Sequence, residues 1–154
     1  MIKELDLHHQ EILTDVFELQ RASYIIEAQL IRFFDIPPLL ETKKELKECG
    51  ETFLGYFEGD SLAGAISYTI EENELTICRM VVHPSHFRKG IAQKLITRVE
   101  EQNPDITVLS VSTGKDNLPA KNLYLKNGFN HVSDLEVIPG LFISHFKKEK
   151  HHPD

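Results

Sequence analysis

A strand-turn-helix segment in the middle of the sequence has residue types and spacing suited to binding an anion. A strand-like run ends at Val82, a short basic turn follows, and a helical pattern starts at Gly90. The amino end of a helix presents unpaired N–H groups and the positive end of the helix dipole. Gly90 and Ala92 are small enough to let an anion approach this backbone closely. Arg88 and Lys89 add positive charge, so the segment predicts a pyrophosphate site.

The same segment is also compatible with an ordinary strand-helix turn that uses glycine for its shape. Two other phosphate-binding patterns are absent from the sequence. Gly114-Lys115 lacks both the earlier glycine and the following Ser or Thr of a P-loop. No G-x-G-x-x-G occurs, which excludes the common dinucleotide fingerprint.

A second segment, from Asn117 to Phe129, could supply a proton donor. Ala120, Leu123 and Tyr124 fall on one face of a predicted helix that Gly128 closes. A phenol with a pKa near ~10 can donate a proton to a departing thiolate of pKa ~8.5. The alternative is a core tyrosine whose hydroxyl is satisfied within the fold.

Helices and strands must position these two segments. The hydrophobic period changes between 3.6 and 2 along the chain, which predicts one mixed α/β domain. The predicted order is β, α, α, β, β, β, α, β, α, β, β. The predicted strands cover residues 1–5, 52–57, 62–70, 75–82, 106–111, 129–137 and 141–146. The predicted helices cover residues 90–102 and 117–127, together with the helical region between the first two strands.

The region between the first two strands has a helical pattern from residue 9 to 19 and a second helical stretch from 24 to 31. The second stretch must end before Pro37-Pro38, because proline lacks the amide donor. Thr42 is expected to cap a short helix that ends near Cys49-Gly50. Glu45 three residues later completes a capping box.

Length and composition limit the classes of protein to consider. The chain has 154 residues, which predicts one domain with a sizeable core. Its 41% hydrophobic and 27% charged residues are typical of a soluble domain and exclude collagen and coiled coils. No apolar run is long enough to span a bilayer, and the start has no apolar signal segment, so a cytoplasmic location is expected. Cys49 and Cys78 lie in unlike contexts, which argues against a disulfide framework and a zinc site.

The charge distribution is uneven. A net charge of −7 argues against a nucleic-acid partner. Most acids lie in the first half, and no carboxylate occurs between Glu74 and Glu100. The gap holds five basic residues, which form either a solvated helix face or a site for a phosphorylated ligand: Arg79, Arg88, Lys89, Lys94 and Arg98.

Together the two segments resemble the GNAT superfamily of acetyl-CoA-dependent N-acetyltransferases. The acetyl-CoA loop of that family reads Gln/Arg-x-x-Gly-x-Gly/Ala, and Phe87–Ala92 matches it at Gly90 and Ala92. The later motif reads Asn-x-x-Ala-x-x-Leu/Phe-Tyr-x-x-x-Gly-Phe. It matches at Asn117, Ala120, Leu123, Tyr124, Gly128 and Phe129. The element order fits a GNAT-like domain over residues 1–147, with a central mixed, mostly antiparallel sheet of about seven strands and a polar tail at 148–154.

The resemblance implies roles for these residues and acetyl-CoA as the cosubstrate, with no metal. The strand carrying Met80 and Val82 would separate from its neighbour and bind the pantetheine arm. Asn117 would contact the cofactor or fix the loop beside it, and Tyr124 would protonate the CoA thiolate. The pyrophosphate would bind the backbone amides of Arg88, Lys89, Gly90, Ile91 and Ala92.

Two positions depart from the family pattern. Phe87 stands where the loop motif has Gln or Arg, although Arg88 is adjacent. Thr76 stands where some members have a glutamate as general base, and Thr76 cannot take a proton. Glu74, acting through water, is the first candidate for the base and His83 a weaker one. A hairpin-turn role for Glu74, or a chain of waters as the base, remains an alternative.

The region over residues 20–51 would form the acceptor wall in this fold. Tyr24 and Glu27 are the predicted acceptor-binding residues, because an aromatic ring and a carboxylate can hold a cationic amine. A polyamine-like molecule, an amino sugar or a lysine side chain would fit, as a small-molecule or peptide acceptor. The alternative is that the aromatic rings are core and the carboxylates solvated. Other residues of this wall are Phe33, Phe34, Asp35, Glu41 and Glu51.

Three functions from different classes therefore remain open. The first is an N-acetyltransferase that moves an acetyl group from acetyl-CoA to a primary amine by direct attack in a ternary complex. No cysteine lies in an activated context, so a covalent acetyl-enzyme is not expected. The second is an acyl-CoA-binding regulatory module without turnover, and the third is an unrelated interaction domain. The last hairpin could offer an edge for a homodimer.

Overall fold

A computed structural model of the chain describes residues 1–32 and 40–150. The order of its helices and strands confirms the mixed α/β prediction. A short 3₁₀ turn, η1 (Pro84–His86), follows the fourth strand. The elements are β1 (Ile2–Leu5), α1 (Gln10–Ile31), α3 (Lys43–Lys47), β2 (Thr52–Glu58), β3 (Ser61–Glu71), β4 (Glu74–Val82), α4 (Ile91–Gln102), β5 (Val108–Gly114), α5 (Leu118–Lys126), β6 (Asn130–Ile138) and β7 (Leu141–Glu149).

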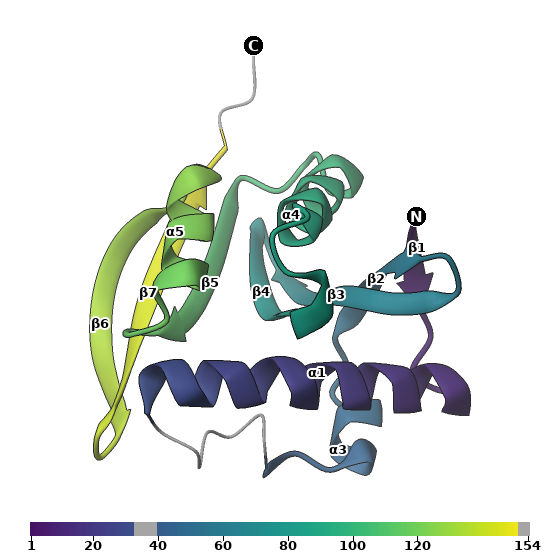
Figure 1. Cartoon of the computed structure of the whole chain (residues 1–154). Helices are drawn as coiled ribbons and strands as arrows, with labels where there is room; N and C mark the ends of the chain where they lie inside the picture. The colour runs from purple at the N-terminus through teal and green to yellow at the C-terminus, as the bar shows by residue number, and fades with distance from the viewer. Residues whose placement is uncertain (33–39, 151–154) are drawn as a thin grey trace.

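The strands form one seven-stranded sheet in the order β1-β2-β3-β4-β5-β7-β6 (Figure 1). Every neighbouring pair is antiparallel except β4 and β5, which are parallel. This agrees with the predicted mixed, mostly antiparallel sheet. The parallel pair lies in the middle of the sheet, and β7 inserts between β5 and β6.

Helices cover both faces of the sheet (Figure 1). The helix α1 crosses one face with α3 beside it, and their apolar side chains pack with Phe53, Ala65 and Val81 of the strands. The helices α4 and α5 lie on the other face, where Leu95 and Tyr124 join the larger core cluster. The sheet therefore lies between two layers of helices.

The helix α1 is continuous over 22 residues, so the expectation of two separate helical stretches was wrong. Residues 20–23 join the two stretches and include no helix breaker. The sequence pattern concealed this continuity because Gln20, a polar residue, is fully buried on the inner face. The predicted capping box of α3 is confirmed, with reciprocal hydrogen bonds between Thr42 and Glu45.

The strands β4 and β5 pair over only part of their length. Their register runs from Glu74 opposite Val108 to Ile77 opposite Val111, although the strands continue to Val82 and Gly114. The break coincides with an irregularity against β3, where Ser67 pairs with Arg79 and Tyr68 with Ile77, leaving Cys78 as an extra residue. A bulge of this kind bends a strand and changes which side chains face each side. The strand separation implied by the family resemblance is therefore present.

The predicted strand boundaries need two corrections. The strand predicted at 106–111 begins at Val108 and continues to Gly114. Ile106 instead belongs to the preceding turn, where its amide donates to the carbonyl of Asn103. The last strand, predicted to end at Phe146, continues to Glu149, because its partner β5 provides hydrogen bonds along that whole length.

Candidate active site

A cavity of about 210 Å³ lies where β4 and β5 stop pairing. Met80 contributes from β4, Thr113 from β5 and Tyr124 from α5, while Glu27 reaches in from α1. The two strands no longer bond to each other here, so their backbone groups are available to a ligand that enters between them. We call this space the strand cleft.

Tyr124 is held rigidly at one wall of the strand cleft. Only 3% of its surface is exposed, and its ring packs against Phe129 and Phe146 at centroid distances of 5.7 and 6.0 Å. Burial, with a smaller contribution from the carboxylate of Glu27, raises the pKa of its phenol well above the ordinary value. The phenol therefore stays protonated at physiological pH and can act as a proton donor.

Asn117 links the strand cleft to three elements. Its side-chain oxygen accepts a hydrogen bond from the amide of Ala120 at 3.2 Å, which caps α5. Its amide group donates to Thr113 Oγ1 at 3.3 Å, and that hydroxyl donates to Glu27 Oε1 at 3.4 Å. Asn117 thus fixes the loop before α5, which is one of the two roles that the sequence suggested.

Glu27 can approach β5 because a glycine stands opposite it. A Cβ atom added at Gly114 would lie 2.7 Å from Ile31 Cγ2 and 3.7 Å from Glu27 Oε1. A side chain there would have to displace the side chain of Ile31. The glycine therefore lets α1 pack closely on β5, and the carboxylate of Glu27 lines the same cavity as the phenol of Tyr124.

The loop between β4 and α4 has the backbone that the anion-binding prediction requires. Gly90 precedes α4 with a left-handed conformation, φ +73°, and no side chain caps the helix. Arg88 is also left-handed, with φ 66°. The side chain of Ile91 is buried in the core, so only its backbone is available to a ligand. The amino end of α4 is thus open to an anion.

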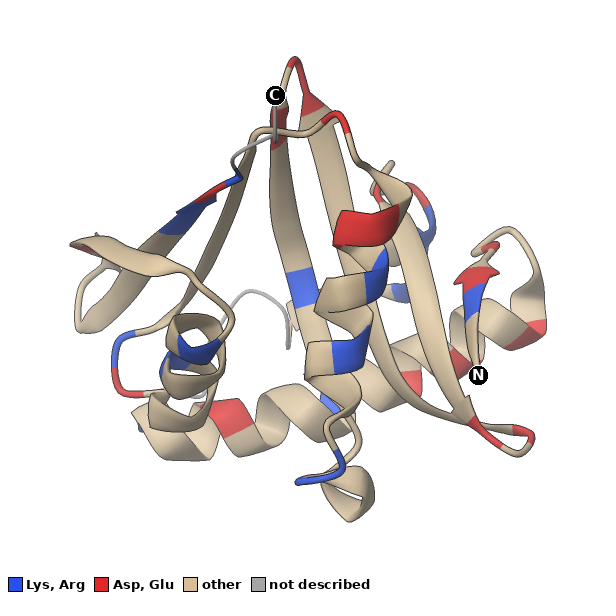
Figure 2. Cartoon of the chain, turned by 90° about the horizontal axis from the view of Figure 1, so that it is seen from above, with Lys and Arg blue, Asp and Glu red and all other residues tan. Residues whose placement is uncertain are grey.

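The five basic residues in the segment without carboxylates, between Glu74 and Glu100, do not all lie together. Lys94 and Arg98 line a cavity of about 570 Å³ that also touches Gly90. Figure 2 shows basic segments along α4 and in the loop before it. Arg79 instead lies on the α1 side of the sheet among carboxylates. It therefore does not belong to the predicted phosphate-binding set.

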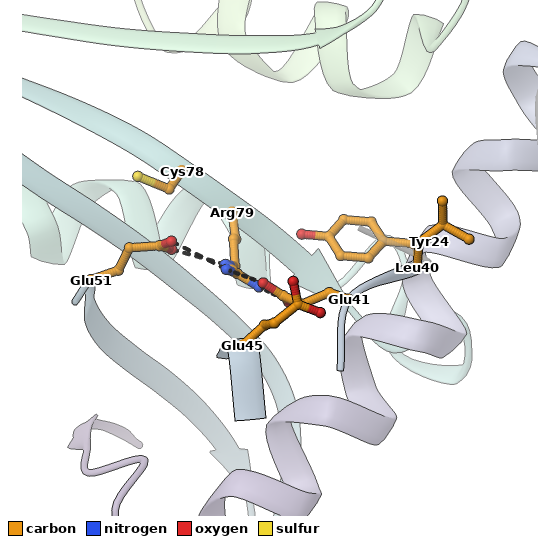
Figure 3. A pocket seen from close by; sticks show the side chains of 7 residues that line it. All are labelled: Tyr24, Leu40, Glu41, Glu45, Glu51, Cys78 and Arg79. Carbon is orange, nitrogen blue, oxygen red and sulfur yellow. Dashed lines mark hydrogen bonds and ion pairs between the residues drawn. The ribbon is translucent and has the colours of Figure 1, made fainter. Parts of the chain in front are cut away.

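The guanidinium of Arg79 is held by two carboxylates, those of Glu41 and Glu51 (Figure 3), and by the side-chain amide of Gln20. It contacts Glu41 through two hydrogen bonds, one of them at 2.8 Å between Nη2 and Oε2. It contacts Glu51 through Nε at 2.9 Å and through Nη2 at 3.1 Å. Its Nη1 also donates to the side-chain oxygen of Gln20 at 3.0 Å. We call these four residues the Arg79 cluster.

The Arg79 cluster is largely removed from water. The exposed fractions of the Arg79, Glu41 and Glu51 side chains are 12, 17 and 13%. Burial opposes the ionisation of Glu41, but hydrogen bonds from Arg79 and Gln20 outweigh it and hold the pKa of that carboxyl below its usual range. Burial likewise disfavours the charge on Arg79, but its hydrogen bonds to Glu41 and Glu51 raise its pKa. Arg79 and Glu41 are therefore both charged at neutral pH.

A second cavity, of about 500 Å³, lies beside the Arg79 cluster (Figure 3). Glu41, Glu45 and Glu51 line it together with Leu40. It shares three lining residues with the strand cleft, namely Tyr24, Cys78 and Arg79. We call it the acidic cavity, and it adjoins the strand cleft on the α1 side.

Glu74, the first sequence candidate for a general base, is not brought to the strand cleft. It begins β4, about six residues and ~20 Å of extended strand before Met80. Its carboxylate lies 3.6 Å from Lys147 Nζ, and both side chains are more than 40% exposed. This is the hairpin-turn position that was the alternative for Glu74, and it leaves Glu27 as the carboxylate facing Tyr124.

The other sequence candidates occupy varied positions. His83 caps η1, where its Nδ1 accepts from the amide of Ser85 at 3.1 Å, so it has a structural role in the turn. Thr76 lies 3.2 Å from Ser110 across the paired part of β4 and β5. Val82 packs against the larger core. Phe33, Phe34 and Asp35, three residues of the predicted acceptor wall, lie outside the described residues.

Sequence reasoning missed the role of Arg79 and a hydrogen-bonded pair near the strand cleft. Ser112 lines the strand cleft, and its Oγ lies 2.8 Å from Nδ1 of His145 on β7. Arg79 carried a usable signal, because it falls at every-second-residue spacing with apolar Ile77 and Val81, on what would be one apolar face of a regular strand. A charge in that position must find partners within the fold. The Ser112–His145 pair joins strands far apart in sequence and had no local signal.

The described residues lack two kinds of feature. None of the helices among them is both long and apolar enough to cross a membrane. No three His, Cys, Asp or Glu side chains among residues 1–32 and 40–150 group in a way that could hold a metal ion.

Comparison with known proteins gives a consistent result. A family model described as the acetyltransferase (GNAT) family matches residues 13–129. The chain is 39% identical over 142 residues to the UPF0157 protein YqkA of Bacillus subtilis. That match covers 91% of this chain, which spans about two fifths (41%) of the length of that curated relative.

Solved structures share the fold at low sequence identity. A PaiA N-acetyltransferase from Thermoplasma acidophilum, in complex with coenzyme A, has a TM-score of 0.77 at 21% identity over 97% of this chain and 99% of its own. The ribosomal-protein-S18-alanine N-acetyltransferase of Escherichia coli has a TM-score of 0.77 at 13% identity. That match covers 100% of this chain and 97% of the Escherichia coli chain.

Proposed function

Because the chain belongs to the GNAT acetyltransferase family, we propose that it moves an acetyl group from acetyl-CoA to a primary amine by direct attack in a ternary complex. The observation that supports this most strongly is the placement of Tyr124 in the strand cleft, opposite Glu27. A proton donor and a carboxylate then face the same gap between β4 and β5. The amine is a cationic small molecule or peptide group.

The residues around the strand cleft fit acetyl-CoA, which supplies an acyl group activated as a thioester. The open amino end of α4, with the amides from Arg88 to Ala92, would hold the pyrophosphate. The backbone of Met80 and Val82, free of β5, would bond the pantetheine arm. Lys94 and Arg98 add positive charge beside Gly90. Binding of the cofactor would rest mainly on backbone groups. It is therefore compatible with Phe87, which stands where the family motif has Gln or Arg.

Tyr124 and Glu27 have complementary roles in this proposal. Tyr124 holds a proton at its phenol oxygen and gives it to the departing sulfur, and its raised pKa keeps that proton in place before the reaction. Glu27 attracts the cationic amine and takes its first proton, which frees the nitrogen lone pair to attack the thioester carbon. The second proton passes from the tetrahedral adduct to the Tyr124 oxygen as the phenol protonates the sulfur, so the C–S bond breaks and no phenolate is left. The hydroxyl of Thr113 steadies Glu27 at 3.4 Å. Both protons that leave the nitrogen therefore have an acceptor.

Replacing Glu27 by Gln is expected to lower kcat about 10²-fold, because general-base catalysis is typically worth this much or more. The amide keeps the size of the side chain and an acceptor for Thr113, so the fold should persist. The rate of the variant should recover at high pH, where the amine loses its proton to solvent. A kcat–pH profile of both proteins measures this. A variant profile parallel to that of the wild type would remove Glu27 from the proton path.

Replacing Gly90 by Ala is expected to weaken acetyl-CoA binding by roughly tenfold, since a left-handed residue with a side chain costs about 1–2 kcal/mol. Relief of that strain would turn the loop amides away from the anion. Gly59→Ala is a matched control, because Gly59 has φ +60° and equally open surroundings in the β2–β3 turn. Calorimetric titration with acetyl-CoA compares the two. Equal affinities for both variants would show that the loop does not hold the cofactor.

The proposal is tested by measuring CoA thiol release from acetyl-CoA against polyamines, amino sugars, amino acids and lysine or N-terminal peptides. Release with one class of amine supports the transferase. Binding of acetyl-CoA without release from any amine would favour the regulatory module instead. Absence of both binding and release would contradict the assignment of the loop from Arg88 to Ala92.

A further inference from the structure

Carboxylates outnumber cations in the two adjoining cavities. Four carboxylates line them, those of Glu27, Glu41, Glu45 and Glu51. Among the described lining residues, Arg79 is the only basic one. Its guanidinium is already bonded to Glu41, Glu51 and Gln20, so it has little capacity left to bind an anionic ligand. The electrostatic character of the acidic cavity therefore favours a cation.

Tyr24 provides a second, independent sign of a ligand. Its side chain is 6% exposed and lines both cavities. Figure 3 shows its phenol pointing toward Arg79 and Glu41. Within residues 1–32 and 40–150, its hydroxyl forms no hydrogen bond. No buried side-chain polar atom of the described residues lacks a partner, so the hydroxyl oxygen is the part of this otherwise buried side chain that is open to the cavity. It can therefore bond to a polar group that enters there.

The charge state of that hydroxyl also favours a cation. Burial raises the pKa of Tyr24, and although Arg79 opposes this, the carboxylates of Glu27, Glu41 and Glu51 raise it further. The phenol is therefore neutral, with lone pairs that can accept a hydrogen bond from an ammonium group. The surrounding carboxylates would supply the countercharge. An ammonium group in the acidic cavity would balance the excess of carboxylates and would donate a hydrogen bond to the Tyr24 hydroxyl.

We propose that the acidic cavity binds the second, non-reacting ammonium of a diamine acceptor. This rests on the proposed acetyl transfer, since Glu27 and Tyr124 serve the reacting amine in the strand cleft. The two cavities meet at Tyr24, Cys78 and Arg79, so a flexible methylene chain can place one nitrogen in each. Leu40 adds an apolar surface for the methylene groups. The acceptor class is an aliphatic molecule with two separated primary or secondary amines.

Glu45 is the residue best suited to test the acidic cavity. It lines the cavity without contacting Arg79, and its Oε1 accepts the Thr42 amide at 2.9 Å. Gln at this position keeps that acceptor and the capping box, so Glu45→Gln removes charge but preserves α3. Glu48→Gln is the matched control, because Glu48 is exposed at the end of the same helix and does not line the cavity.

The first experiment compares 1,4-diaminobutane with 4-aminobutan-1-ol as acceptors. The wild type should use the diamine with a kcat/KM at least about tenfold higher, as expected for one added charged hydrogen bond. Glu45→Gln should raise KM for the diamine several-fold without changing kcat for the diamine. It should change neither kcat nor KM for the amino alcohol. Glu48→Gln should behave as the wild type. Equal use of the two amines, with Glu45→Gln unchanged, would overturn the proposal while acetyl transfer stands.

A binding measurement separates this proposal from acetyl transfer itself. Calorimetry with CoA present should detect 1,4-diaminobutane binding to the wild type, weaker binding to Glu45→Gln and no comparable binding of 4-aminobutan-1-ol. This result would support the acidic cavity even if no amine were acetylated, in which case the transferase proposal alone would fail. Equal affinity for the diamine and the amino alcohol would contradict the second-ammonium site, whatever the outcome for turnover.

Discussion

Replacing Tyr124 by Phe should lower kcat by about 10²–10³-fold and leave acetyl-CoA affinity nearly unchanged. The hydroxyl is the proton donor in the proposed reaction, whereas the ring supplies packing against Phe129 and Phe146. Phe keeps that packing, so the fold and the cofactor loop should be retained. Steady-state kinetics gives the loss in turnover, and calorimetric titration with acetyl-CoA gives the affinity.

Tyr68→Phe is the matched control, because Tyr68 is another buried tyrosine of the same core cluster and does not line the strand cleft. It should leave kcat close to that of the wild type. The raised pKa of Tyr124 adds a second readout, since its phenol stays protonated and kcat should not decline as the pH rises to about 10. A Tyr124→Phe variant that loses acetyl-CoA binding as much as turnover would place Tyr124 in binding or folding instead.

The second large effect is expected from Arg79→Met, which should lower the free energy of unfolding by about 3–5 kcal/mol at neutral pH. The substitution leaves the carboxylates of Glu41 and Glu51 largely buried without their cation. An uncompensated buried charge costs more than the lost contacts of Arg79. Urea denaturation, followed by circular dichroism, measures the difference.

The effect of pH on this variant has a definite sign. In the wild type the pKa of Glu41 is lowered on folding, so its contribution to stability is present above the ordinary value of ~4.3 and is lost as the pH falls through the folded value. In Arg79→Met the same carboxylates oppose folding while they are ionised. The difference in free energy of unfolding between the wild type and Arg79→Met should therefore become smaller as the pH falls toward about 4.

A triple variant gives the control for the Arg79 cluster. Arg79→Met combined with Glu41→Gln and Glu51→Gln removes all three charges, and it should recover much of the stability lost in Arg79→Met alone. Such recovery would assign the loss to unpaired charge. Equal stability of Arg79→Met and the wild type at neutral pH would show that the cluster does not hold α1 and β4 together.

Local patterns in the sequence were sufficient to predict most of the fold. The alternation along β3 and β4, the stripe on α4 and the capping box at Thr42 are each encoded within a few residues. The motif around Asn117 was equally local, because the cap of α5 and the placement of Tyr124 depend on one short helix. The course of α1 could not be read so directly, since the buried Gln20 interrupts its apolar face.

The site was less predictable, because it is assembled across elements. Glu74 and Thr76 share a face of β4, yet the separation of β4 from β5 begins only after Ile77. The bulge at Cys78 has no strong sequence signal, and it is what sends Arg79 to the α1 side. The partners of Arg79 come from three segments, at Gln20, Glu41 and Glu51. Long-range pairing of this kind cannot be deduced from spacing along the chain.

The most direct test of the account is to follow the acetyl group itself. The protein would be incubated with acetyl-CoA labelled in its acetyl group and with the amine that gives the fastest thiol release. Mass spectrometry would then locate the label. We expect the label on the nitrogen of the amine, in an amount equal to the CoA released, and none on the protein. Label on the protein, or in free acetate with unmodified amine, would contradict direct transfer from acetyl-CoA to the amine in the strand cleft.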